Sequence, residues 1–93
     1  MKKRISERLS LSAVMHEIPM PGCALVEILD TDRVLIENHL GVTQYEEEII
    51  RVRTKFGGIC ISGQQLALTG MTRGKLEIKG RIRSVSLQRE DEA

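Results

Sequence analysis

The chain has 93 residues, which is enough for one domain and leaves little room for a second. It contains no Trp, one Phe and one Tyr, so its core has to be built from Ile, Leu, Val and Met. The formal net charge of +1 excludes a strong overall field that would attract nucleic acid or anionic lipid. A thin aliphatic core also makes self-association a reasonable way to complete burial.

The first 22 residues differ in pattern from the rest. Residues 1–8 form a basic arm, and Ile5, Leu9 and Ala13 fall at four-residue steps, which favours a short helix over about 10–18. The basic start is not followed by a continuous apolar run, so we predict neither a signal peptide nor a membrane helix. We therefore expect a soluble, cytoplasmic protein. The arm is read as a solubilising tail, with contact to an anionic membrane surface as the alternative.

From Cys23 onward the apolar residues recur with period two, which is typical of β-strands. The predicted strands cover about 25–29, 33–37, 42–45, 50–55, 59–61, 66–68, and finally 76–82 with 85–87. Turn residues separate them at 30–32, 38–41, 46–48, 57–58, 63–65 and 71–74. We expect an all-β fold, a small twisted antiparallel meander that closes into a roll or sandwich, with a short N-terminal helix.

Two segments echo each other, because 57–63 reads G-x-I-x-I-x-G and 74–80 reads G-x-L-x-I-x-G. A β-solenoid would produce such repeats, but two copies are too few to indicate one, and local hairpins explain the glycines equally well. The predicted organisation is therefore an arm and helix in 1–22, a single β domain in 23–88 and a disordered tail in 89–93.

The side chains that could act as soft metal ligands are His16, Cys23, His39 and Cys60. They form no C-x-x-C or H-x-x-x-H pair, so neither a metal site nor another cofactor is predicted. The two cysteines are read as thiols in a reducing cytoplasm. Isoleucines flank Cys60, and an apolar setting makes a thiol a poor nucleophile. The acidic run 46–48 is read as a solvated turn. We therefore expect no enzymatic activity and no small-molecule substrate.

Basic side chains occupy alternate positions of two predicted strands, and so share one face of each. They are Arg51, Arg53 and Lys55 in one strand and Lys75, Lys79, Arg81 and Arg83 in the other. If these strands are neighbours, one face of the sheet is positive. The simplest interpretation is a solvated face whose lysines guard an edge. The functional one is a docking surface for an acidic partner, anionic lipid or nucleic acid, of which nucleic acid is the weakest because few aromatic residues are available for stacking.

Several glycine-punctuated strands occur in a fixed order. The pattern comprises Ile18-Pro19, Ile36-Glu37-Asn38-His39 with Gly41, Tyr45, Ile50, Val52, Thr54, Gly57-x-Ile59-x-Ile61-x-Gly63, Leu66, Leu68, Gly74-x-Leu76-x-Ile78-x-Gly80 and Ile82-x-Ser84-Val85. This order and spacing resembles the YabP/YqfC family of sporulation proteins over about residues 10–88, with the I-E-N-H-x-G part closer to the YqfC branch.

The resemblance implies a non-enzymatic protein of endospore formation with a structural or assembly role in spore maturation. We expect it to form a homo-oligomer, because exposed edge strands favour pairing between copies. The YqfC branch further implies a membrane-protein partner, and hence a location in the mother cell, at the periphery of the forespore membrane. The alternative is a small β-barrel regulator that binds nucleic acid through the basic face. Nucleic-acid binding would weaken steeply with salt.

Overall fold

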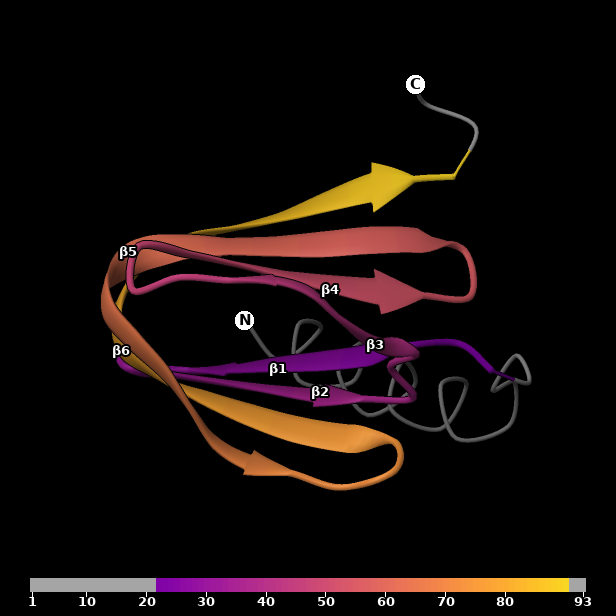
Figure 1. Cartoon of the computed structure of the whole chain (residues 1–93), viewed down its shortest axis with the longest axis horizontal. Coiled ribbons are helices and arrows are strands. Elements are labelled where there is room, and N and C mark those ends of the chain that lie inside the picture. Colours follow the sequence, from indigo (N-terminus) through magenta and orange to yellow (C-terminus); the bar gives the residue numbers. More distant parts are fainter. Residues whose placement is uncertain (1–21, 91–93) are drawn as a thin grey trace, which may run out of the picture.

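The computed structural model describes residues 22–90, and this part of the chain folds as six strands (Figure 1). The strands are β1 (Leu25–Leu29), β2 (Arg33–Glu37), β3 (Gly41–Tyr45), β4 (Ile49–Thr54), β5 (Gly57–Met71) and β6 (Lys75–Arg89). They form one antiparallel sheet in the order β1-β2-β6-β5-β4-β3. The prediction of an all-β antiparallel fold is confirmed. The predicted arm and helix in 1–22 fall almost wholly outside the described residues.

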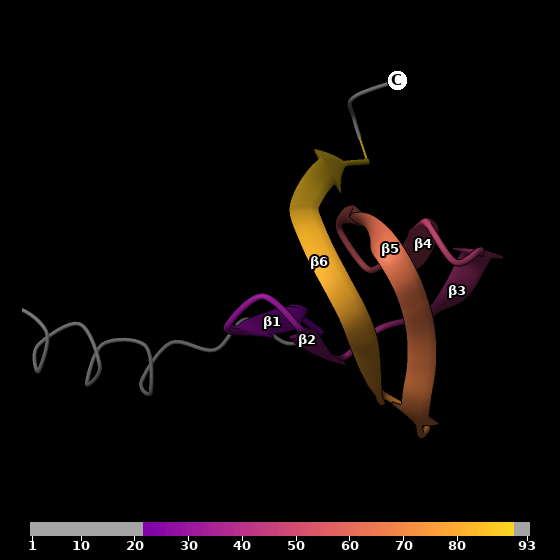
Figure 2. The ribbon, with the colours of Figure 1, turned by 90° about the vertical axis from the view of Figure 1, so that its left-hand side faces the viewer.

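The two 15-residue strands β5 and β6 form the spine of the sheet. The pairing of β2 with β6 covers only residues 75–79 of β6, and the pairing of β4 with β5 covers only residues 57–62 of β5. Each short hairpin therefore extends a different half of the spine. Both long strands curve round at the left of Figure 1, and Figure 2 shows the two hairpins on opposite sides of the spine. The single sheet is thus folded over into a roll.

The core lies on the concave side of this roll and is entirely aliphatic. Its nine buried residues come from both halves: Val34, Ile36, Ile50, Val52, Ile59, Ile61, Leu66, Leu76 and Ile78. They alternate with exposed or half-buried residues along β2, β4 and β6, as the period-two pattern requires. Within residues 22–90 the predicted aliphatic core is confirmed, and the Met of this part, Met71, is 60% exposed.

The predicted turn at 63–65 is wrong, because β5 runs through it with two register shifts against β6. Gln65 adopts a φ of 56° here. A Cβ on Gly63 would lie 1.9 Å from the Arg81 carbonyl oxygen, and one on Gly80 would lie 2.6 Å from that of Gln65. Glycine is required at both positions because the two backbones approach closely where they bend. The break in the alternation at 63–65, which resembles a turn in the sequence, is therefore a bend inside β5.

The predicted turn at 57–58 is also displaced. Lys55 and Phe56 form the turn, and Gly57 and Gly58 already belong to β5. Gly57 has a φ of 150°, and a Cβ there would lie 1.9 Å from the Gln88 carbonyl oxygen. Gly57 therefore allows the backbones of β5 and β6 to approach closely. The echo of 57–63 and 74–80 belongs to an antiparallel hairpin of two long strands.

Candidate functional site

The predicted basic residues separate into three places in the folded sheet. β5 lies between β4 and β6, so the two basic strands are not neighbours, and the condition for one continuous positive face is not met. Arg51 and Arg53 lie on the outer face of β4, opposite the buried Ile50 and Val52. The sequence could place these side chains on one face of a strand, but it could not supply the order of the strands.

Two of the three basic residues on the outer face of the β2–β6 pair form ion pairs with carboxylates. The Lys75 ammonium lies 3.3 Å from the Glu37 carboxylate, and the Arg33 guanidinium lies 3.3 Å from that of Glu77. A hydrogen bond from Thr69 lowers the pKa of Glu77 most, desolvation opposes this shift, and Arg33 and Lys79 lower the pKa further. Because these pairs are exposed, they contribute little to stability. This region fits the interpretation of a solvated face.

Three of the predicted basic residues lie at the ends and the bend of strands. Lys55 is in the β4–β5 turn, with its ammonium 5.5 Å from the centre of the Phe56 ring. Arg81 is paired with Gln64 at the bend of the long strands. Arg83 falls at the register shift between the Ser62–Ser84 and Gly63–Ile82 pairs. Arg83 is exposed like Lys75 and Lys79, and the alternation of β6 changes just after it, at Ser84.

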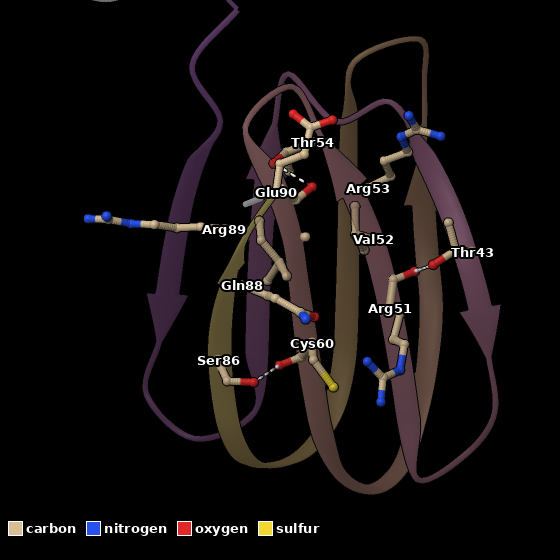
Figure 3. Close-up of a pocket in the computed structure, with 13 residues that line it drawn as sticks. Thr43, Arg51, Val52, Arg53, Thr54, Cys60, Ser86, Gln88, Arg89 and Glu90 are labelled. Carbon is tan, nitrogen blue, oxygen red and sulfur yellow. Dashed lines mark hydrogen bonds between the residues drawn. The ribbon is translucent and has the colours of Figure 1, made fainter. Parts of the chain in front are cut away.

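A hollow of about 480 Å³ crosses β4, β5 and β6 on the outer face of the roll. We call it the β4–β6 trough (Figure 3). In the sheet register, Gly58 lies between Arg53 and Gln88, and Cys60 lies between Arg51 and Ser86. Because Gly58 carries no side chain, β5 forms the floor of the β4–β6 trough at this point. The side chains of β4 and β6 form its walls. Sequence reasoning missed this feature, since it placed Gly58 in a turn.

The two arginines of the β4–β6 trough are held differently. The Arg51 Nε donates a hydrogen bond of 2.9 Å to the side-chain oxygen of Gln44, whose amide donates 2.8 Å to Glu46. Gln44 therefore orients the guanidinium of Arg51 and leaves its other donors available. Within residues 22–90, the Arg53 side chain makes no hydrogen bond or ion pair. The β4–β6 trough thus contains one preoriented guanidinium and one without a described partner, from alternate residues of β4.

The chain matches the YabP family over residues 24–93, which is most of its length. The chain belongs to the YabP family. This membership suggests a role related to sporulation. The match does not distinguish the YqfC branch. No curated protein and no solved structure matches the chain.

The other chemically reactive side chains of this YabP-family chain include two thiols and one imidazole among residues 22–90. Cys23 and Cys60 are free thiols, exposed and half-buried respectively. The Nε2 of His39 is 3.3 Å from the Thr72 carbonyl oxygen, while its Nδ1 is buried without a hydrogen-bond partner. Residues 22–90 contain no group of three or more His, Cys, Asp or Glu side chains that could hold a metal ion. His16 lies outside the described residues.

The outer strands β1 and β3 offer a second kind of surface in this YabP-family fold. β1 pairs with β2 in unbroken register over all five of its residues, and its other edge faces no strand of the described chain. Leu25, Ile28 and Leu29 are 45%, 55% and 38% exposed, which places apolar surface on both faces of this edge strand. Among the described residues there is no helix long and apolar enough to span a bilayer.

Proposed function

We propose that this YabP-family chain is a non-enzymatic sporulation protein with a structural or assembly role in spore maturation. It acts by associating with copies of itself and by binding a partner protein. Family membership supports the link to sporulation. The observation that carries the assembly role is the open, apolar edge of β1.

The β1 edge lacks the features that normally prevent strands from pairing between molecules. Such edges are usually protected by lysine, proline or a β-bulge. β1 has the sequence Leu-Val-Glu-Ile-Leu, in which Glu27 is the sole charged residue, and its register with β2 contains no bulge. A strand from a second copy could form hydrogen bonds with the backbone N–H and C=O groups on the outer edge of β1, and it would cover Ile28.

The opposite outer strand is a poorer candidate for pairing. The register between β3 and β4 shifts between Val42 and Gln44, and such an irregularity twists an edge away from a flat partner. Thr43 also directs its hydroxyl to the Arg51 carbonyl oxygen at 3.4 Å, within its own sheet. We therefore assign self-association to β1.

Light scattering behind a sizing column tests this assignment. We expect the wild-type mass to exceed that of a monomer and to rise with concentration, while Ile28→Lys reduces it to a monomer because an ammonium group cannot be buried in the new interface. Leu40→Lys is the matched control, because Leu40 is 63% exposed but lies in the β2–β3 connection. A wild-type protein that remains monomeric at all concentrations would refute self-association.

We further propose that the partner is a sporulation membrane protein, which would hold the chain in the mother cell at the periphery of the forespore membrane. The resemblance of Ile36-Glu37-Asn38-His39-x-Gly41 to the YqfC branch supports this. Tagged protein recovered from sporulating cells should bring a membrane protein with it, and recovery from the soluble fraction without one would contradict the proposal. The separation of β4 from β6 argues against the nucleic-acid alternative, which would require salt-dependent binding to DNA or RNA.

A further inference from the structure

We propose that the β4–β6 trough binds an extended, acidic segment of a partner protein through Arg51 and Arg53. This deepens the partner-binding part of the proposed function and rests on it. The β4–β6 trough and the β1 edge belong to opposite halves of the roll, so partner binding and self-association can be tested separately.

The spacing of the two arginines suits an extended ligand. Arg51 and Arg53 are alternate residues of β4 and point to the same face, so their Cα atoms are about 6.5 Å apart. A peptide in extended conformation has the same repeat, and every second side chain points the same way. Two carboxylates separated by one residue can therefore meet both guanidinium groups, each of which can bind a carboxylate through two parallel hydrogen bonds.

The charges that line the β4–β6 trough favour an anionic ligand. Its lining contains three arginines and one acidic residue, Glu90, which lies at one end. Because no described residue neutralises Arg53 and Gln44 already orients Arg51, an acidic ligand would find both groups ready to bind.

The shape of the β4–β6 trough depends on one glycine that the backbone does not require. A Cβ on Gly58 would meet its nearest atom, the Val52 carbonyl oxygen, at an ordinary 3.5 Å. Gly57, by contrast, is needed for close contact with β6. A side chain at position 58 would therefore fill the floor and leave the sheet intact. No aromatic residue lines the hollow, so it offers no surface on which nucleic-acid bases could stack, and a peptide is the better occupant.

Fluorescence anisotropy with a labelled peptide tests the proposal. The probe alternates glutamate with serine over seven residues, and a matched peptide carries glutamine in place of glutamate. We expect the full-length protein to bind the glutamate peptide and to lose affinity for the glutamine peptide. Arg53→Glu should weaken binding at least about tenfold, because attraction is replaced by repulsion. Gly58→Val should do the same while leaving every arginine in place.

Arg81→Glu is the control, because it makes the same change of charge at the bend, outside the β4–β6 trough. It should change affinity by less than about twofold. Equal losses in Arg53→Glu and Arg81→Glu, or equal binding of the two peptides, would overturn the proposal. The proposal would also be overturned if a single-stranded oligonucleotide displaced the peptide and its binding depended on the same residues. The trough would then be a nucleic-acid site. Light scattering of Arg53→Glu separates a failure of peptide binding from a failure of self-association. The mass of the Arg53→Glu protein in solution should equal that of the wild type.

Discussion

Glu77 is the described residue whose ionisation is most clearly shaped by the fold. The Thr69 hydroxyl donates a hydrogen bond of 2.8 Å to its carboxylate, which also pairs with Arg33. Both contacts favour the charged carboxylate, and they lower its pKa below the ordinary value of 4.5. Neither contact follows from the sequence, because the register of β5 with β6 places Thr69 beside Glu77 and that of β2 with β6 places Arg33 there.

Thr69→Val should therefore raise the pKa of Glu77, because the hydrogen bond to the carboxylate is lost. A group whose pKa is lower in the folded state adds stability above its unfolded pKa, and this stability is lost as pH falls through the folded pKa. The melting temperature of the wild type should thus fall more steeply below about pH 4.5 than that of the variant. Carbon NMR titration of the carboxyl group measures the pKa. Thr43→Val, on the other half of the sheet, should leave it unchanged, and an unchanged pKa in Thr69→Val would contradict this account.

At the scale of the strand, the bend in β5 and β6 decides the shape of the protein. Period-two alternation located segments of both strands but divided β5 at 63–65, because the bend depends on backbone proximity at Gly63 and Gly80, which alternation does not report. Each of these glycines ends one copy of the sequence echo, and they lie on adjacent strands at the same bend. The similarity of 57–63 and 74–80 therefore reflects two adjacent strands, β5 and β6, that bend at neighbouring positions.

Gly63→Ala should lower the free energy of unfolding by about 2 kcal/mol or more, because its Cβ would collide with the Arg81 backbone and no flexible side chain can give way. Gly74→Ala is the matched control, since a Cβ there meets nothing within 4 Å. Urea denaturation at one fixed protein concentration compares them. If Gly63→Ala is as stable as Gly74→Ala, the bend does not require close contact of the two strands.

At the scale of the whole molecule, the sequence predicted the composition of the sheet better than its arrangement. The alternation around Val34, Ile50 and Ile78 placed these residues in the core correctly. The pairing of β2 with β6 could not be foreseen, because it joins segments about 40 residues apart and depends on the folding over of the spine. Local patterns report the face of a strand, whereas strand order is set by contacts between distant segments.

The same limit applies to the candidate site. Arg51 and Arg53 were correctly placed on one face of a strand, since this requires only their spacing. The pairing of Lys75 with Glu37, the register shift at Arg83 and the hollow at Gly58 all depend on cross-strand register. Register therefore divides the predicted basic residues among the β4–β6 trough, the ion-paired face of β2 and β6, and the ends and bend of the strands.

Hydrogen exchange of the backbone amides, measured at low and high protein concentration, tests most directly whether the molecule assembles through its β1 edge. We predict that residues 25–29 become more protected as concentration rises, because a second copy then bonds to their free backbone groups, while residues 41–45 exchange at the same rate throughout. Assembly through the β1 edge would be contradicted if exchange in residues 25–29 did not depend on concentration. It would also be contradicted if new protection were confined to residues 41–45.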